Sequence, residues 1–424
     1  PPRSTLFPYT TLFRSAEITN LKNKIARIKI LRQLFFTPGL TSSEISNAID
    51  KSLPVTTQLL TELIQEGRIE ETGLAGSTGG RRPQTYSLAD GSFQILSVAM
   101  DQLVTRIALV DEKARVVGTR QLFELNLYKN PDSLSELIEC IRLFINSENV
   151  DTSRILGIGI GMPGFVDVKK GINNSFLPSA EGSVIEIIEK AIGLPVWIDN
   201  DSSLIALAES KWGAAKDKKH VMVLNIGWGI GLGMLLNGKL YRGQEGFAGE
   251  FSHMSLFEND KLCNCGKYGC LETEASLLVT LEKVNKGIVN GAVTSIAMPD
   301  LNHKEAAAKS LIKAVLEGDR FAIEVLSESA YQIGRGVAIL IHLLNPEAIV
   351  ISGFGSLAGK AWIAPIQQAI NELCIPALAQ NVEIRISDLA SKAELLGAAA
   401  LVAENYGKKE QIPDNKQVNL NHSW

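Results

Sequence analysis

The sequence has little cysteine, few aromatic residues and no excess of either charge. Of 424 residues, 5 are Cys and 6% are aromatic, and 42 Lys plus Arg against 46 Asp plus Glu give a formal net charge of −4. This balance excludes a uniformly basic nucleic-acid coat, although a local basic patch stays possible. Five cysteines exclude a disulfide-rich secreted scaffold. The hydrophobic share of 45% and the length predict roughly two or three globular domains.

Long apolar runs and targeting signals are also missing. A membrane span needs about 18 apolar residues, and the closest stretch, Val221 to Leu236, is interrupted by four glycines. No signal peptide is recognisable, so we expect a soluble, cytoplasmic protein. Thr5 to Ser15 read TLFPYTTLFRS, which matches the translation of a sequencing-library adapter. We therefore expect residues 1–15 to be adapter-derived or disordered.

Residues 16–90 have the outline of a winged helix-turn-helix. Apolar residues recur at helical spacing in Asn20 to Phe36, whose other face is basic, and further helices are predicted at Ser42 to Ile49 and Leu53 to Gln65. A strand near Arg68 to Glu71, a Gly-rich loop and a return strand at Thr85 to Leu88 follow. Three short helices followed by a hairpin are typical of this DNA-binding fold.

The third predicted helix is the candidate for reading the DNA major groove. We expect the apolar residues to face inward: Val55, Leu59, Leu60, Leu63 and Ile64. The polar side chains are expected to face outward and offer hydrogen bonds to bases or phosphates: Thr56, Thr57, Gln58 and Thr61. Arg81 and Arg82, at the tip of the wing, are candidates for phosphate or minor-groove contacts. The alternative is a packing domain with a merely solvated polar face. Bulk charge does not decide, because residues 16–90 hold nine Lys or Arg and eight Asp or Glu.

After Ser92 the pattern predicts two α/β halves. Strands are expected at Ile95 to Met100, Arg106 to Val110 and Val116 to Phe123, and the alternation of strands and helices starts again at Val221. Two halves with similar starts indicate a duplicated fold with a cleft between two lobes. Residues 408–424 are polar and are expected to fray.

Three cysteines and one histidine form a cluster with metal-ligand spacing. His253, Cys263, Cys265 and Cys270 follow the pattern H-x9-C-x-C-x4-C. Four such ligands suit one tetrahedral Zn²⁺ with no open position, so the predicted site is structural. The ion would fix the loop from Glu250 to Glu272, which brings two carboxylates together.

This loop carries a resemblance to a known family. The run AGEFSHMSLFENDKLCNCGKYGCLE, Ala248 to Glu272, closely resembles the signature of the ROK family of repressors, open reading frames and sugar kinases. The likeness covers about residues 92–403 and includes GIGIGMPGFVD from Gly157, IDND from Ile198, NIGWGIGLG from Asn225, LNPEAIVISGFG from Leu344 and LLGAAAL from Leu395. It implies a winged helix-turn-helix followed by a two-lobed, actin-like and hexokinase-like (ribonuclease H-like) α/β body. Lobe 1 would span 91–199, completed by about 391–407, and lobe 2 would span 200–390.

The resemblance also implies a sugar site. In the kinases of the family an Asn-Asp pair, the zinc His and two Glu bind the hexose hydroxyls, and they match Asn200, Asp201, Glu250, His253 and Glu272. Asp201 would be the general base of a kinase. Carboxylates and an amide suit a polyol, because a mispaired ligand leaves buried groups unsatisfied. One departure is Phe176, near a position where the family often has an Asn.

The residues expected around the phosphates of ATP depart from the kinase pattern. The turn that reads Asp-x-Gly-Gly-Thr in kinases is here Asp101 to Thr105, with Leu103 and Val104 in place of glycines. In the second loop, Trp228 replaces a hydroxyl residue between Gly227 and Gly229. Gly353 and Gly355 survive at the adenosine end, but such glycines also serve ordinary turns. Mg-ATP is therefore a doubtful cofactor, and we expect no kinase activity.

These observations favour a sugar-responsive, DNA-binding transcriptional regulator of carbohydrate metabolism, in the repressor branch of the family. Its expected partners are operator DNA and a hexose, an amino sugar or its phosphate, and we expect a homodimer or homotetramer. One alternative is an ATP-dependent, glucokinase-like sugar kinase with an appended DNA-binding domain. Another is a scaffold protein with an empty cleft.

Overall fold

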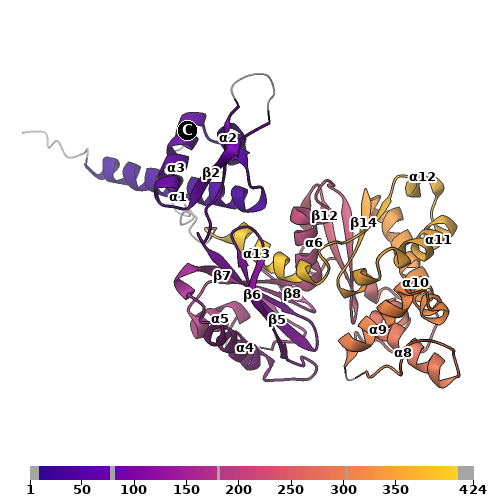
Figure 1. Cartoon of the computed structure of the whole chain (residues 1–424). Helices are drawn as coiled ribbons and strands as arrows, with labels where there is room; N and C mark the ends of the chain where they lie inside the picture. The colour runs from indigo at the N-terminus through magenta and orange to yellow at the C-terminus, as the bar shows by residue number, and fades with distance from the viewer. Residues whose placement is uncertain (1–8, 77–81, 179–181, 302, 409–424) are drawn as a thin grey trace, which may run out of the picture.

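The computed structural model describes residues 9–76, 82–178, 182–301 and 303–408. An N-terminal domain stands on a two-lobed body, and the chain runs through them in order before the last helix returns to the first lobe (Figure 1). The N-terminal domain is a winged helix-turn-helix with the sheet order β1-β3-β2. Its elements are α1 (Tyr9–Phe36), β1 (Leu40–Thr41), α2 (Ser42–Ile49), α3 (Leu53–Gln65), β2 (Ile69–Leu74) and β3 (Gln84–Leu88).

Local sequence explains where these elements begin. Thr41 caps α2: its hydroxyl accepts a bond from the backbone N–H of Glu44, whose carboxylate accepts one from the backbone N–H of Thr41. Pro54 in the first turn suits the start of α3, because the missing N–H would be unpaired there. Both helices have the predicted bounds, whereas α1 begins at Tyr9 rather than near Asn20.

The first lobe is built on a five-stranded sheet with the order β10-β7-β4-β5-β6. The strands are β4 (Gln94–Met100), β5 (Val104–Asp111), β6 (Val116–Glu124), β7 (Ile155–Met162) and β10 (Val196–Asn200). β4, β5 and β6 form an antiparallel meander, and β7 and β10 join β4 in parallel. One face packs on α4 (Ser133–Ser147) and α5 (Val184–Ile192). A small hairpin, β8 (Val166–Asp167) and β9 (Ile172–Asn173), follows β7.

The second lobe repeats this plan with the order β13-β12-β11-β14-β15. Its strands are β11 (Val221–Ile226), β12 (Ile230–Leu236), β13 (Lys239–Tyr241), β14 (Ala348–Ser352) and β15 (Glu383–Ile386). Met222, Leu224 and Ile226 point to one face, which a large helical layer covers: α7 (Glu272–Ala275), α8 (Leu277–Val289), α9 (Lys304–Leu316), α10 (Arg320–Leu344), α11 (Ile363–Leu373) and α12 (Pro376–Ala379). Val221 and Val223 face the opposite core, as the two-residue period of a strand requires.

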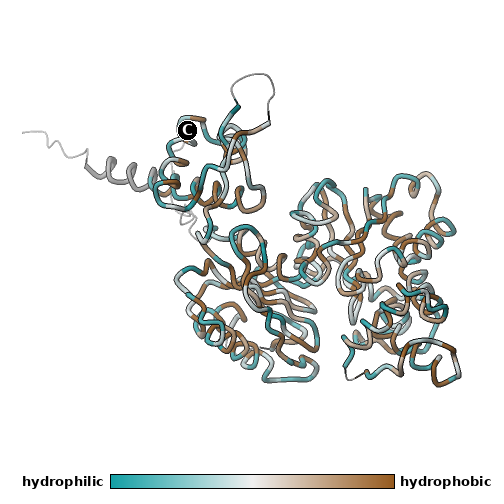
Figure 2. Tube along the Cα trace, viewed as in Figure 1, coloured by the Kyte–Doolittle hydropathy of each residue, from teal (hydrophilic) through white to brown (hydrophobic). Residues whose placement is uncertain are grey.

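Two helices, α6 (Asp201–Trp212) and α13 (Ala393–Asn405), lie between the sheets (Figure 1). α13 packs on β4 and β7, and α6 packs on β11 and β12 and against α13. The helices approach closely at Gly397, where an added Cβ would lie 2.1 Å from the carbonyl oxygen of Leu204. Figure 2 shows brown, hydrophobic segments within both lobes and teal, hydrophilic segments at many of the outer turns.

The N-terminal domain is attached through an aromatic contact between α1 and α6. The rings of Phe35 and Phe36 each lie 5.6 Å from the ring of Trp212, centroid to centroid. The buried residues of α1, α2 and α3 form one continuous core with those of α6 and α13. Within the described residues, no helix is long and apolar enough to cross a membrane.

Candidate functional site: an interlobe cleft and a DNA-reading helix

A cavity of about 590 Å³ lies between the two lobes. All five residues predicted to bind a sugar line it: Asn200, Asp201, Glu250, His253 and Glu272. They come from the β10–α6 junction, the loop after β13 and the start of α7. Phe176 lines the same cavity.

Asn200 and Asp201 are held at the N-terminus of α6. The Asn200 side chain caps this helix by accepting bonds from the backbone N–H groups of Ser202 and Ser203, and its amide donates to the carbonyl of Gly164 at 3.2 Å. Asp201 accepts a bond from the backbone N–H of Ser202 at 2.8 Å. These bonds fix both side chains before any ligand arrives.

Asn225, at the end of β11, also reaches this group. Its amide donates to the Asp201 carboxylate at 3.3 Å and to the Ser202 hydroxyl at 3.1 Å, and it lines the cavity. In the sequence, Asn225 begins the motif NIGWGIGLG, but no binding role was predicted for it. Its position near the end of a buried strand, two residues before Gly227, was the available signal.

Burial raises the pKa of Asp201 to about 7. The bond from the Ser202 backbone opposes this rise, and the negative charge of Glu394 adds to it. Near neutral pH the Asp201 carboxyl therefore takes and releases protons. This is the property of a general base, and equally of a group that switches between donating and accepting a hydrogen bond.

The loop after β13 gathers the predicted metal ligands. The donor atoms of His253, Cys263, Cys265 and Cys270 all lie within 4.8 Å of one another. The Cys265 and Cys270 sulfurs are 3.6 Å apart, close to the roughly 3.8 Å that tetrahedral Zn–S bonds of about 2.3 Å would require. The His253 Nδ1 atom is 3.5 Å from the Cys263 sulfur. This donor set fits a metal ion.

The same loop places Glu250 and Glu272 at the cavity. The other ring nitrogen of His253, Nε2, lies 3.8 Å from a Glu250 carboxylate oxygen. A Glu272 oxygen accepts a bond from the backbone N–H of Ile230 at 3.4 Å. Burial raises the pKa of Glu250, although His253 lowers it. His253 therefore links the predicted metal to the cavity wall.

Opposite these groups, the turn from Asp101 to Thr105 closes on itself. Asp101 accepts bonds from the backbone N–H groups of Leu103 and Val104 at 2.8 and 2.9 Å. The resemblance to kinases of the family places two glycines at these positions, and their backbone N–H groups would approach the phosphates of ATP. Here the N–H groups of Leu103 and Val104 are bonded to Asp101 instead. Thr105 is fully buried rather than exposed in the cavity, and its hydroxyl has no partner among the described residues.

Arg106 is the functional-site residue that sequence reasoning missed. Its guanidinium is buried and lies 3.0 Å from Asp101, 3.6 Å from Glu394 of α13 and 3.8 Å from Glu305 of α9. Burial alone would lower the pKa of Arg106, but the negative charges of Glu394 and Asp101 outweigh this effect. The pKa is raised overall, so the guanidinium stays charged. The contact with Glu305 joins the two lobes. Nothing local in the sequence signals the contacts with Glu305 and Glu394, because both residues are far from Arg106 along the chain.

Trp228 stands in the second loop of this half of the cavity. Its ring stacks on Phe354 with centroids 5.9 Å apart. Gly227 and Gly229 form a tight turn, and a Cβ on Gly229 would lie 2.6 Å from the Glu272 carboxylate. Gly353 and Gly355 do not line the cavity but pack on the end of β11. Packing accounts for the small size of both residues, and Gly353 also has a φ of +73°, a conformation that favours glycine.

On the N-terminal domain, one expected DNA contact was wrongly oriented. Thr56 is fully buried, and its hydroxyl donates to the Ser52 carbonyl at 3.1 Å. The buried residues of α3 are Thr56, Leu59, Leu60 and Leu63. Val55, which was predicted to face inward, is instead 39% exposed, so Thr56 takes its place on the buried face. A threonine can take this place because its hydroxyl bonds to the preceding turn.

The other predicted polar residues of α3 are exposed. Thr57 and Thr61 project from one side of the helix, and the Gln58 amide donates to Glu62 at 3.1 Å. Arg82, at the base of the wing, is exposed as well, whereas Arg81 lies outside the described residues. An exposed polar helix face next to a β-hairpin is the arrangement by which such domains read a major groove.

The fold and the cleft define a two-lobed actin-like body of the hexokinase type joined to a winged helix-turn-helix. The model of the ROK family matches residues 96–405, and the chain belongs to this family. Both predictions from the sequence, the family and the fold class, are confirmed.

Relatives of two kinds are similar to this chain. A putative xylose repressor of Caldicellulosiruptor sp. is 28% identical over 90% of this chain and 96% of its own length. The transcriptional regulator NagC of Escherichia coli is 27% identical over 82% and 84%. A glucokinase of Halalkalibacterium halodurans is 32% identical, but over 63% of this chain and 82% of its own length.

Among solved structures, the chain is similar to a ROK family transcriptional regulator, a homologue of the E. coli MLC protein. The TM-score is 0.73 at 27% identity, covering 90% of this chain and 96% of the other. A ROK family glucokinase from Streptomyces griseus has a TM-score of 0.61 at 24% identity over 73% and 98%, which shows the shared fold. The two repressor relatives and the MLC homologue are thus matched over more of this chain than the two glucokinases.

We expect Asp201→Asn to raise the melting temperature, and to raise it more at pH 8 than at pH 5. An unfolded Asp has a pKa near 3.9, whereas that of folded Asp201 is about 7. The folded state therefore retains a proton that the unfolded state has lost, and the wild type loses stability as the pH rises through this window. Asn does not ionise, so the variant avoids the loss. Differential scanning fluorimetry from pH 5 to 8 measures the difference.

Asp217→Asn is the matched control. Hydrogen bonds from Arg385 lower the pKa of Asp217 to about 2, so this carboxylate is ionised throughout the range. The control should lower the melting temperature by a constant amount. A gain for Asp201→Asn that is equal at pH 5 and pH 8 would contradict the assignment of a raised pKa.

Proposed function

We propose that this protein is a sugar-responsive, DNA-binding transcriptional regulator, a repressor of carbohydrate metabolism. One observation carries the proposal: all five residues proposed to bind a polyol line one cavity, whereas Asp101, Arg106 and Trp228 line the side proposed for the phosphates of ATP. The body that holds this cavity is joined to a winged helix-turn-helix. The family and the repressor relatives support the same function.

The proposed ligand is a hexose, an amino sugar or a sugar phosphate. Asn200, Asp201, Glu250, His253 and Glu272 would bind its hydroxyl groups, since carboxylates, an imidazole and an amide offer the acceptors and donors that vicinal hydroxyls need. Asn225 would orient Asp201. Phe176 would place an aromatic ring beside the sugar, where the family often has an Asn.

The phosphate side favours binding without phosphoryl transfer. Phosphoryl transfer depends on donors and cations aimed at the phosphates. Here Asp101 already accepts bonds from the backbone N–H groups of Leu103 and Val104, and three carboxylates surround Arg106. The indole of Trp228 stands in the other loop. A sugar kinase remains the second candidate because Asp201, with a pKa of about 7, has the chemistry of a general base.

The DNA-binding surface would be the exposed face of α3 with the wing. Thr57, Gln58 and Thr61 would contact bases or phosphates, and Arg81 and Arg82 would contact the backbone or the minor groove. Such readers usually act as two-fold assemblies, so we propose a homodimer or homotetramer that acts on DNA in the cytoplasm.

Zinc is the proposed metal at His253, Cys263, Cys265 and Cys270. Four protein ligands leave no open position, so the ion would be structural and would supply no step of a reaction. Its role would be to hold the loop that presents Glu250 and Glu272 to the ligand. His253 would bind zinc through Nδ1 and face Glu250 through Nε2.

The test of the proposed function is ligand binding without turnover. In a thermal-shift screen of hexoses, N-acetylhexosamines and their 6-phosphates, at least one compound should stabilise the protein, by about 2.7 kcal/mol at a hundred times its dissociation constant. Glu272→Gln should weaken this binding at least tenfold, because it removes an acceptor for a hydroxyl. The exposed Glu282→Gln on α8 is the matched control and should leave binding unchanged. A coupled assay with Mg-ATP should detect no ADP release; turnover that Asp201→Asn abolishes would establish the kinase instead.

Removal of the metal should weaken sugar binding as well as stability. Metal analysis of the purified protein should find one zinc per chain, and Cys270→Ser should lose it together with most of the sugar affinity, because the loop no longer holds Glu250 and Glu272 in place. Cys140→Ser, which changes a buried cysteine of α4 outside the cluster, should keep both. Full sugar affinity in a zinc-free protein would refute the proposed role of the ion.

A further inference from the structure

A second cavity lies where the N-terminal domain meets the body. It has a volume of about 490 Å³ and is formed by the end of α1, the end of α6 with the segment that follows, and the end of α13. Four of its lining residues are cationic, Arg32, Lys211, Lys216 and Lys408, and the one carboxylate among the lining residues is Glu404. The cavity therefore has an excess of positive charge, although the whole chain has a net charge of −4. A concave site with such an excess attracts anions.

The one carboxylate is already engaged. The Lys211 ammonium lies 2.9 Å from the Glu404 carboxylate, and the Arg32 guanidinium donates to the Glu404 carbonyl at 3.3 Å. Lys211 also lies over the ring of Phe36, 4.5 Å from its centroid. These contacts bring a cation of the N-terminal domain and one of the body to the same residue, Arg32 at its backbone carbonyl and Lys211 at its carboxylate, and the described residues that line the cavity include no second carboxylate.

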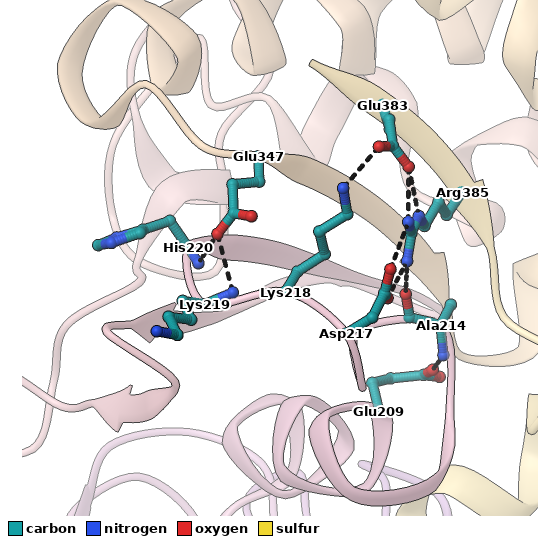
Figure 3. Close-up of polar contacts among 9 residues, drawn as sticks. All are labelled: Glu209, Ala214, Asp217, Lys218, Lys219, His220, Glu347, Glu383 and Arg385. Atoms are coloured by element: carbon teal, nitrogen blue, oxygen red, sulfur yellow. Dashed lines mark hydrogen bonds and ion pairs between the residues drawn. The ribbon is translucent and has the colours of Figure 1, made fainter. Parts of the chain in front are cut away.

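Lys216 is carried by a loop that the rest of lobe 2 holds in place. Figure 3 shows the contacts on both sides of it: the Glu209 carboxylate accepts from the backbone N–H of Ala214 at 2.9 Å, and Arg385 donates to the Ala214 carbonyl at 2.8 Å. Lys218 pairs with Glu383 at 2.6 Å. A lysine on a loop fixed in this way is positioned before a ligand arrives, so less entropy is lost when one binds.

Desolvation lowers the pKa of Lys408, and the positive charges of Arg32 and Arg242 lower it further, although Glu404 raises it. The cations of this region thus repel one another, and a bound anion would relieve the repulsion. A planar guanidinium together with ammonium groups is the set that binds phosphate oxygens best. Gln33, Thr37 and Ser210 add neutral polar groups to the lining.

We propose that this cavity binds a small phosphorylated metabolite, with its phosphate group between Arg32, Lys216 and Lys408. The volume lies within the range of small-molecule sites and exceeds what inorganic phosphate needs, so the phosphate would be carried by a polar organic group. The site is separate from the interlobe cleft, because the two sets of lining residues have no member in common.

The position of the cavity gives such a ligand a regulatory effect, and this part of the inference rests on the proposed function. Arg32 belongs to the N-terminal domain, whereas Lys216 belongs to the body, so one phosphate would join them. α6 begins at the cleft with Asp201 and ends beside the cavity with Trp212, which packs on Phe36. A ligand here would favour one orientation of the DNA-reading helices on the body and change DNA affinity.

The experiment is calorimetric titration of the full chain with glucose 6-phosphate, glycerol 3-phosphate and inorganic phosphate at constant ionic strength, with glucose for comparison. We expect at least one organic phosphate to bind more tightly than inorganic phosphate. Lys216→Ala and Arg32→Gln should each weaken this binding at least fivefold. Lys216 is exposed, so its truncation leaves the fold intact, and Gln at position 32 keeps a donor for the Glu404 carbonyl. Lys219→Ala, an exposed lysine of the same loop outside the cavity, is the control and should bind as the wild type does.

Three results would overturn the proposal. The first is that none of the phosphate compounds binds. The second is that their binding survives Lys216→Ala and Arg32→Gln but is lost in Glu272→Gln, which would place the phosphate in the interlobe cleft. The third is that Lys216→Ala weakens DNA binding in phosphate-free buffer, which would assign these cations to DNA. Phosphate binding that persists in Glu272→Gln while sugar binding is lost would support a separate site, so failure here and failure of the proposed function are distinguishable.

Discussion

The packing of α6 is the constraint on which the rest of the structure depends. Its first turn holds Asn200 and Asp201 in the cleft by capping bonds, and its last residue, Trp212, packs against Phe35 and Phe36 of the N-terminal domain. Between these ends the helix lies against α13 so closely that Gly397 has no room for a side chain. A helix packed this tightly moves as a unit, because closely packed interiors do not deform continuously. We infer that a displacement of α6 at the cleft would reach the DNA-binding domain through Trp212.

The two sides of the cleft differ in what their polar groups do. On the side proposed to bind the sugar, Asp201 and Glu250 line the cavity with pKa values raised by desolvation, and the hydroxyl groups of a polyol would satisfy their oxygens. On the opposite side, Asp101 and Arg106 satisfy each other, and Glu305 extends the ion pairs from one lobe to the other. An internal ion pair thus stands on the side where the resemblance to kinases of the family places the phosphates of ATP. Our proposal of binding without phosphoryl transfer rests on these contacts within the chain.

Much of this architecture was predictable from the sequence, and the failures have physical causes. α2 and α3 have the predicted bounds because the Thr41 cap of α2, Pro54 in the first turn of α3 and the apolar spacing of both helices are local signals. The metal cluster likewise depends on spacing within one loop. The rotation of α3 was mispredicted because a threonine that bonds to its own helix can be buried. The contacts of Arg106 with Glu305 and Glu394, and the cavity at the end of α6, could not be predicted, because they join residues hundreds of positions apart.

The central claim is that a sugar in the cleft changes DNA binding by the N-terminal domain. Its most direct test is the affinity of the full chain for a DNA fragment selected by the protein from a random library, measured by fluorescence anisotropy with and without the sugar found by screening. We predict an affinity that falls steeply with salt and changes by about 5- to 150-fold when the sugar saturates the wild type, but not when Glu272→Gln prevents sugar binding. An affinity that is the same at zero and saturating sugar would contradict it.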